Sequence, residues 1–325
     1  MPTLPPSSTD SSTPSDAPDS SRPPRWRLPA LLFAATLASV LYAGASNVDT
    51  DAAAGPVAQL LRGWVFALPL LSILLAHEFG HYFAARAHRV PASLPLFLPM
   101  PISPFGTWGA IISMPRAIAS RRALLDVGAA GPLAGMAVAL PVLCYGLSLS
   151  KVEPLPPHGL LEGECLLYML LKYLIVGPVP AGYDVFLHPV AFAGWGGLFV
   201  TMINLLPFGQ LDGGHIAYAL FGRGHDRFGP WVRWALLPLC LANLARNLLS
   251  ARAAGFPEGS VTQALSNSFF WFAWFLILTV LGRVGGTRHP PTASNEPLGP
   301  GRRAIAIGSL LLFVLLFMPA PFTVH

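Results

Sequence analysis

The residues with the clearest chemical potential are His77, Glu78 and His81, which form an HExxH motif. On a helix, His77 and His81 lie four positions apart on one face, so both imidazoles can bind one metal ion. Glu78 lies beside them and can act as a general base on a metal-bound water. The alternative is two buried histidines bonded to helix carbonyls, with a carboxylate left uncompensated in apolar surroundings. Because that alternative is costly, we interpret the motif as a metal site.

A third ligand is expected, because catalytic zinc sites usually have three protein ligands and one open position. The best candidate is Asp212, in the stretch NLLPFGQLDGG. Pro207 and Gly209 interrupt a helix there, and the glycines at 213–214 let the backbone turn close to a metal. Asp212 could instead be the N-cap of a helix that starts near His215.

The composition places these residues in a membrane protein. The chain has 325 residues, of which 53% are hydrophobic and 11% are charged, and its mean hydropathy is +0.56. A soluble protein carries about 25% charged residues, and no soluble fold of this size can bury so much apolar surface. The bilayer is therefore an expected partner of the chain.

Charge and cysteine usage exclude other classes. The net charge of +5 comes from basic residues scattered beside apolar runs, so we expect no nucleic-acid partner. Cys144, Cys165 and Cys240 are widely spaced, so we expect neither a disulfide framework nor a thiolate metal site.

Apolar segments about 20 residues long predict an all-α polytopic membrane protein with six to seven transmembrane helices. The predicted spans are 28–46, 63–84, 123–149, 185–206, 231–249, 266–282 and 304–321. The proline-rich stretch 91–118 is too broken for a helix and too apolar for a free loop, so we expect a re-entrant, β-like segment. Residues 160–176 are apolar but carry interrupting charges, and we interpret them as a helix lying in the outer interface rather than a span.

Arginine placement predicts the orientation. With the N-terminus in the cytoplasm, most arginines fall on the cytoplasmic side, and Arg62, Arg246 and Arg252 fall outside. Residues 1–25 are rich in Ser, Thr, Pro and Asp, so we expect a disordered cytoplasmic tail without a cleavable signal peptide at its start.

The third predicted span carries features that favour packing. Gly131 and Gly135 form a GxxxG pair, which permits close approach of another helix. Asp126 lies at the start of this span beside Arg121 and Arg122, where we expect it to act as a helix N-terminal carboxylate.

HEFGH together with NLLPFGQLDGG resembles the site-2 protease family of intramembrane zinc metalloproteases. The stretch GTWGA at 106–110 is similar to the family's Gly-x-x-Gly stretch, and the glycine-rich region 126–141 matches as well. The resemblance covers roughly residues 60–222. It implies a compact member without PDZ or CBS modules. We accordingly divide the chain into a tail (1–25), an intramembrane protease core (26–222) and additional transmembrane helices (223–325).

The resemblance also assigns roles. His77, His81 and Asp212 would bind one zinc ion, and Glu78 would activate the water. Asn204, at the family's asparagine, would steady the substrate or the oxyanion, because an amide donates a hydrogen bond without adding charge. Simple helix packing is the alternative for Asn204.

The expected function is therefore zinc-dependent endoproteolysis of a transmembrane segment, near its cytoplasmic side, in a single-span membrane protein. Two alternatives stay open at this point. One is a catalytically silent relative that acts as a scaffold, and the other is a transporter with a metal-binding gate, whose acids would be spread through the bilayer. The sequence carries no signal for an oligomeric state.

Overall fold

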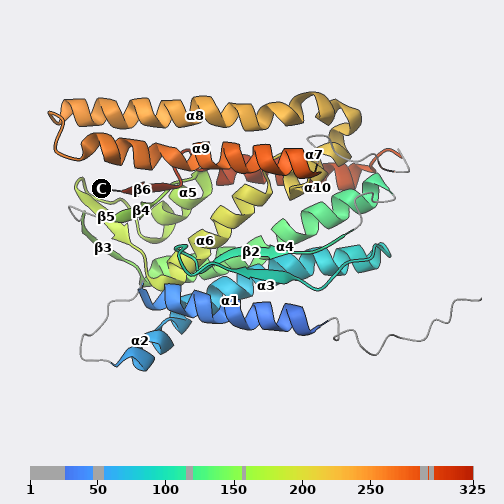
Figure 1. Cartoon of the computed structure of the whole chain (residues 1–325), viewed down its shortest axis with the longest axis horizontal. Helices are drawn as coiled ribbons and strands as arrows, with labels where there is room; N and C mark the ends of the chain where they lie inside the picture. The colour runs from blue at the N-terminus through green and yellow to red at the C-terminus, as the bar shows by residue number, and fades with distance from the viewer. Residues whose placement is uncertain are drawn as a thin grey trace, which may run out of the picture.

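The structure, a computed structural model, describes residues 26–46, 55–114, 120–155, 159–285, 292 and 296–324. The predicted tail at 1–25 and the last part of the predicted re-entrant segment, 115–118, lie outside these residues. Each of the seven predicted apolar segments overlaps a helix, although the ends of some of them, such as 185–188 and 317–321, lie outside the helices (Figure 1). The helices are α1 (Arg27–Ser46), α2 (Pro56–Arg62), α3 (Trp64–Ala87), α4 (Arg121–Leu149), α5 (Leu166–Ile175), α6 (Pro189–Asn204), α7 (Asp212–Phe221), α8 (His225–Ala253), α9 (Ser260–Gly285) and α10 (Pro300–Leu316).

The helical membrane architecture is confirmed, but the helices differ in length and polarity. Among the described residues, α1, α3, α4 and α9 are long and apolar enough to cross a membrane. The apolar helices α6 and α10 have 16 and 17 residues. Helix α8 is long, with 29 residues, but arginines interrupt its apolar sequence. The count of six to seven spans stays a prediction.

Three short antiparallel sheets accompany the helices. β1 (Leu96–Pro99) pairs with β2 (Thr107–Ile111), β3 (Lys151–Pro154) with β5 (Tyr183–Phe186), and β4 (Leu160–Glu162) with β6 (Phe322–Val324). The β1–β2 hairpin is the predicted β-like segment. It packs on α1, where Ser39 Oγ donates to Gly106 O at 2.5 Å and Phe33 meets Phe97 edge to face.

The region 160–176 differs from its prediction in its first half. Residues Leu160–Glu162 form strand β4, and only Leu166–Ile175 are helical, as α5. Ten helical residues extend about 15 Å, half of the ~30 Å hydrocarbon core, so α5 is too short to span it. The prediction of one helix is therefore wrong for 160–165, because pairing with the distant strand β6 satisfies that backbone instead.

Polar contacts connect α5 to strands β4 and β5 and to Glu164 in the segment before the helix. Lys172 Nζ lies 3.1 Å from Glu164 Oε1 and 3.2 Å from Asp184 Oδ1. The Tyr168 hydroxyl donates to Glu162 Oε1 at 2.8 Å. Burial raises the pKa of the Glu162 carboxyl, and the hydrogen bond from Tyr168 only partly opposes this effect.

A buried aromatic cluster joins segments that are far apart in the sequence. Trp195 of α6 is fully buried, and its indole N–H donates to Gly163 O at 2.8 Å. Its ring stacks on Phe192 and Phe199 of the same helix and meets Phe322 of β6 edge to face. Phe105, from the turn of the β1–β2 hairpin, completes the cluster. This core fixes α6, and with it the chain that leads to Asp212.

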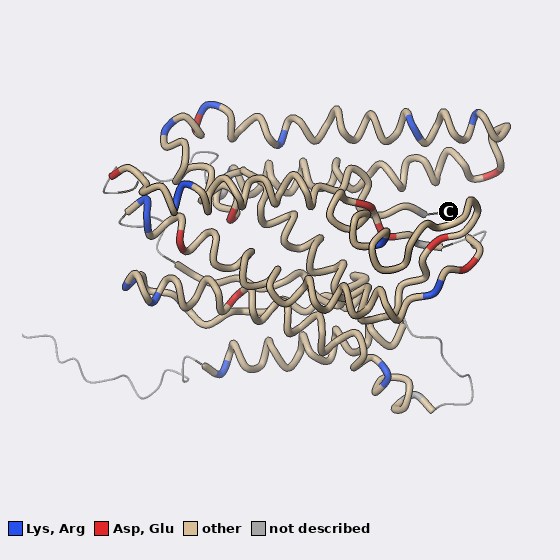
Figure 2. The backbone as a smooth tube through the Cα atoms, turned by 180° about the vertical axis from the view of Figure 1, so that it is seen from behind, with Lys and Arg blue, Asp and Glu red and all other residues tan. Residues whose placement is uncertain are grey.

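Charged residues are concentrated toward the two ends of the helices, and the middle is almost free of them (Figure 2). At one end, the last turn of α3 and the first turns of α4, α8 and α10 contribute arginines: Arg86, Arg121, Arg122, Arg227, Arg302 and Arg303. We call this the arginine-rich end. These arginines are among those that the sequence analysis assigned to the cytoplasmic side.

Candidate metal centre

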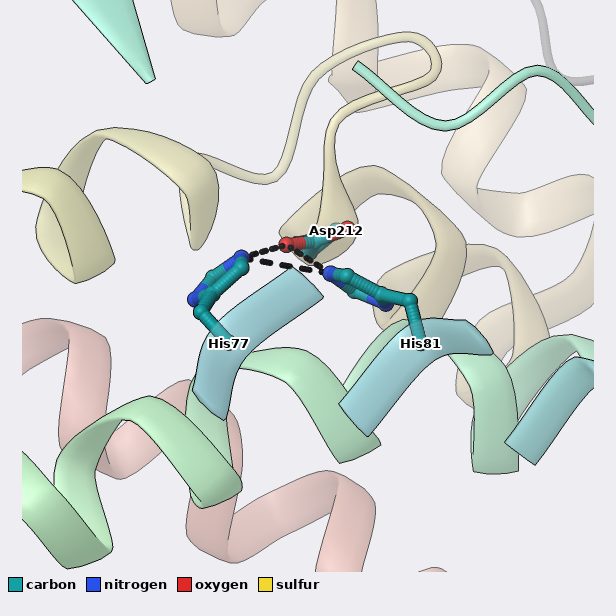
Figure 3. A group of neighbouring side chains, drawn as sticks. All are labelled: His77, His81 and Asp212. Carbon is teal, nitrogen blue, oxygen red and sulfur yellow. Dashed lines mark hydrogen bonds and ion pairs between the residues drawn. The ribbon is translucent and has the colours of Figure 1, made fainter. Parts of the chain in front are cut away.

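Helix α3 places the HExxH residues where the sequence predicts them. His77, Glu78 and His81 lie in its C-terminal half and are only 3%, 7% and 7% exposed. The two imidazoles point to the same side of the helix, with their Nε2 atoms 3.2 Å apart (Figure 3). The i, i+4 spacing thus produces the convergence that a shared ligand requires.

A tight turn brings Asp212 to the same point. Helix α6 ends at Asn204, Gly209 takes a positive φ of 54°, and α7 begins at Asp212 itself. The N-cap position belongs to Leu211, so the N-cap role considered for Asp212 is not the one observed. Asp212 Oδ2 instead lies 3.4 Å from His77 Nε2 and 3.2 Å from His81 Nε2. Residues 131 or more positions apart in the chain therefore form one cluster (Figure 3).

The cluster has the donor set of a zinc site. The ligand atoms of His77, His81 and Asp212 all lie within 4.8 Å of one another. Two imidazole nitrogens and one carboxylate oxygen are established zinc ligands, and three protein ligands leave one position open. Three lone-pair donors gathered in a buried place need a cation between them, so the residues fit the metal that the motif implies.

A backbone carbonyl of α4 orients one of the imidazoles. His81 Nδ1 lies 2.8 Å from Val127 O. Since a carbonyl only accepts hydrogen bonds, the proton is on Nδ1, and the Nε2 lone pair is free to face a metal. Val127 was not expected from the sequence, because a backbone acceptor leaves no side-chain signal.

The glycines of α4 create the space that the histidines occupy. A Cβ at Gly131 would overlap the His81 ring, and one at Gly135 would lie 3.2 Å from His77 Cβ. The GxxxG pair does serve close packing, as expected. The structure adds that the packed partner is the pair of histidines.

Asn204 and Glu78 complete the surroundings of the cluster. Asn204 Nδ2 lies 3.4 Å from His77 Nε2, at the last residue of α6. Glu78 lies within electrostatic range of both histidines and of Asp212. All five sequence-predicted site residues are therefore brought together around one point.

Asp126 does not have the role expected for it. The helix is capped by Ser120, whose hydroxyl accepts from Ala123 N, and Asp126 lies more than a turn further on. Its carboxylate accepts hydrogen bonds from Arg302 Nε, at 2.9 Å, and from Arg302 Nη2, at 2.7 Å, and it contacts His88 Nε2 at 2.8 Å. It therefore ties α4 to α3 and α10 one residue before the carbonyl that orients His81.

His225 of α8 contacts the turn that carries Asp212. It is 1% exposed, and its Nε2 lies 3.1 Å from Pro207 O. Pro207 lies beyond the end of α6, and its carbonyl accepts a hydrogen bond from His225 of α8. A lone histidine after a glycine-rich stretch gives no sequence signal for such a contact.

Comparison with known proteins identifies the family. Residues 65–231 match peptidase family M50, a region that contains every residue of the cluster. The chain belongs to peptidase family M50. The M50 match begins one residue into α3 and ends in the first turns of α8.

Curated relatives of this M50 chain are named as probable zinc metalloproteases. It is 36% identical over 284 residues to the probable chloroplastic zinc metalloprotease EGY1 of Arabidopsis thaliana, covering 83% of this chain and 46% of that protein. It is 30% identical over 270 residues to the probable chloroplastic zinc metalloprotease EGY2 of Oryza sativa subsp. indica, covering 81% of this chain and 44% of that protein. The chain thus spans less than half the length of these relatives. No solved structure matches it.

Proposed function

We propose that the chain is a zinc-dependent endopeptidase that hydrolyses a peptide bond in a transmembrane segment of a single-span membrane protein. The observation that carries the proposal is the convergence of three ligand atoms within 4.8 Å beside a buried glutamate. Membership in family M50 and likeness to proteins named probable zinc metalloproteases support it.

In this proposal His77, His81 and Asp212 hold the zinc ion. When bound, zinc supplies Lewis acidity, which lowers the pKa of a water and polarises the carbonyl to be attacked. Glu78 accepts the proton of that water as its oxygen adds to the carbonyl carbon. Glu78 then gives the proton to the leaving amine nitrogen as the C–N bond breaks. Burial of Glu78 keeps bulk water from competing for this proton.

Asn204 has the chemistry to assist the substrate. Its amide lies beside His77 and can donate to the carbonyl oxygen as that oxygen gains negative charge. An amide does this without adding a charge that would compete with the metal ligands.

The β1–β2 hairpin offers a means to hold an unwound substrate. Among the described residues β2 pairs with β1 only, so its other edge has no strand partner. Trp108 and Ile111 of β2 are 68% and 56% exposed. A helical substrate that unwinds could add to this edge as a further strand, which would present its backbone carbonyl. The alternative is a covering loop without a substrate role.

The orientation follows from the positive-inside rule. We place the arginine-rich end, and the N-terminus with it, in the cytoplasm. Because the metal-binding residues lie in the half of α3 that leads to that end, cleavage would occur near the cytoplasmic side of the substrate.

Each alternative function makes a different demand on the site. A silent scaffold has no need of Glu78, yet the glutamate is present together with all three candidate ligands. A transporter usually spreads its acids through the bilayer, whereas here Glu78 and Asp212 share one cluster.

The test is Glu78→Gln, with Glu258→Gln as control because Glu258 is exposed in the α8–α9 connection. Purified Glu78→Gln protein should keep its zinc, since the ligands are intact. In cells, quantitative membrane proteomics should show a single-span protein or its remnant accumulating with Glu78→Gln and not with Glu258→Gln. Loss of a general base should lower cleavage about 10²–10⁴-fold. Unchanged membrane proteins in the presence of bound zinc would contradict the protease assignment.

A further inference from the structure

A cavity at the arginine-rich end lies apart from the metal-binding residues. It has a volume of about 420 Å³ and is lined by residues of α4, α7 and α10 and of the segment before α10. The ends of these helices lie at the right of Figure 1. Its lining includes Arg121, Leu220, Phe221, Leu298, Arg303 and Ile307. Among the described residues of the lining, two side chains are cationic, none is acidic and the others are apolar.

The arginines around this cavity differ in how their charge is used. Arg302 is bound to Asp126, and Arg122 Nη2 lies 3.2 Å from Glu296 Oε2. Arg303 belongs to α10 and lines the cavity, and it forms no ion pair with any described residue. It is exposed at the mouth of the cavity, so its charge is available to an anion.

Arg121 adds a second donor from the other side. Its Nε and Nη2 donate to Ala219 O, and Nη2 also reaches Leu220 O, both near the end of α7. These carbonyls lie in the last turn of α7, where the helix supplies no further N–H donors, so they can hold the guanidinium in place. The remaining nitrogen, Nη1, makes no bond within the described part of the chain.

An apolar stripe continues from Arg303 along α10. Ile307, Leu311 and Val314 follow Arg303 at helical spacing and are 43%, 58% and 56% exposed. From Arg303 to Val314 the helix extends about 16 Å, close to the ~15 Å depth of one leaflet's hydrocarbon. The surface therefore combines a cationic pocket at the start of α10 with an exposed apolar stripe, about as long as an acyl chain, further along the helix.

We propose that this cavity binds one anionic phospholipid, with the phosphate at Arg303 and Arg121 and an acyl chain along the exposed stripe of α10. A free phosphate would satisfy the arginines but not the stripe, and an uncharged lipid would satisfy only the stripe. Basic pockets between membrane helices recognise anionic headgroups in this way. The lipid would fasten α10 to α7, the helix that begins with Asp212.

The test compares phosphatidylglycerol with phosphatidylcholine of the same acyl chains, by native mass spectrometry of the purified, zinc-loaded chain. The variants are Arg303→Gln, which removes the available charge, and Ile307→Trp, which fills the apolar part and keeps every charge. The control is Arg283→Gln, an exposed arginine at the end of α9 outside the cavity. Inorganic phosphate is added as a competitor.

The wild-type chain and Arg283→Gln should retain phosphatidylglycerol in preference to phosphatidylcholine. Arg303→Gln should weaken that retention about fivefold, and Ile307→Trp should lower it as well. Equal retention of the two lipids, or full preference in either cavity variant, would overturn the proposal. Displacement of the lipid by millimolar phosphate would show that the site binds a free anion. None of these readouts involves proteolysis, so a failure here is distinct from a failure of the proposed function.

Discussion

The helices around the metal-binding residues and the α8–α9 hairpin differ in what surrounds them. Half of the apolar stretch of α3 and of α4 is buried, against 22% of that of α9. Helix α8 has only five buried residues among 29. Large apolar side chains of the hairpin, such as Trp231, Leu241 and Phe269, are exposed instead.

The difference shows where the fold needs specific residues. Around α3, backbone carbonyls and glycines are matched to individual imidazoles, so a change of one atom alters the site. The hairpin is joined to the rest by a few defined contacts. Besides His225, Asn243 Nδ2 and the Trp271 indole N–H both donate to Pro319 O. We expect the first region to be intolerant of substitution and the second to tolerate changes outside these contacts.

The largest contrast should come from removing a carboxylate charge in each region. Asp212→Asn keeps the shape of the side chain but removes the anionic ligand, so zinc binding should fall by roughly tenfold or more and proteolysis should be lost. In Asp226→Asn, at the start of α8, zinc content should be that of the wild type, because Asp226 Oδ1 has no hydrogen-bond partner among the residues that the structure describes. Metal analysis of the two purified variants measures this. Full zinc occupancy in Asp212→Asn would remove Asp212 from the ligand set.

A second contrast uses two glycines that each pack against a histidine ring. Gly131 lies against His81, and Gly229 lies against His225. In Gly131→Ala the new methyl group must displace the His81 ring, so we expect zinc loss together with about 1–3 kcal/mol of overpacking cost. In Gly229→Ala the cost should be similar, but zinc should remain bound. Thermal unfolding and metal content separate these two effects.

Equal zinc loss in the two glycine variants would contradict this contrast. It would mean that the His225 contact with Pro207 is as important for the ligands as the position of His81 itself. Gly55→Ala provides a control, because a Cβ there meets no atom within 4 Å.

How far the sequence could anticipate these regions depends on the kind of signal. Segments of apolar residues predicted the long helices, and helical spacing predicted that His77 and His81 converge. Asp212 was expected from the need for a third ligand and from the family resemblance of its motif. The partner of Asp126 could not be predicted. Arg302 lies 176 positions away and looks like any arginine that flanks a span.

The backbone carbonyls that bind the histidines could not be predicted from the sequence either. Nothing in the residue types of Val127 or Pro207 indicates that their carbonyls hold His81 and His225. The pairing of β4 with β6 depends on chain packing between distant segments, so residues 160–165 were wrongly expected to be helical. Local periodicity reports what a segment can form alone, and these contacts arise only after the helices have packed.

A smaller contrast concerns arginines at the end of each region. Arg302→Gln removes the two-atom contact with Asp126, next to the carbonyl that orients His81. Both side chains are partly exposed, so we expect a loss of only about 1 kcal/mol of stability. Activity should fall more than zinc content, because a displacement of Asp126 would reach His81 only indirectly, through the carbonyl of Val127. Arg283→Gln at the end of α9 should change neither quantity, and an equal effect of the two would show that only overall charge matters.

The smallest effect is expected on the outer face of the hairpin. Leu276 of α9 is 46% exposed, whereas Leu74 of α3 is 2% exposed. Leu74→Ala leaves a cavity among packed side chains and should cost about 2–5 kcal/mol. Leu276→Ala exchanges one lipid-facing apolar surface for a smaller one, and lipid fills the space, so we expect a change below about 0.5 kcal/mol. Denaturant unfolding in the same detergent measures both. A loss at Leu276 as large as that at Leu74 would mean that this face of α9 is covered by protein, and the hairpin would then have to be regarded as an interface.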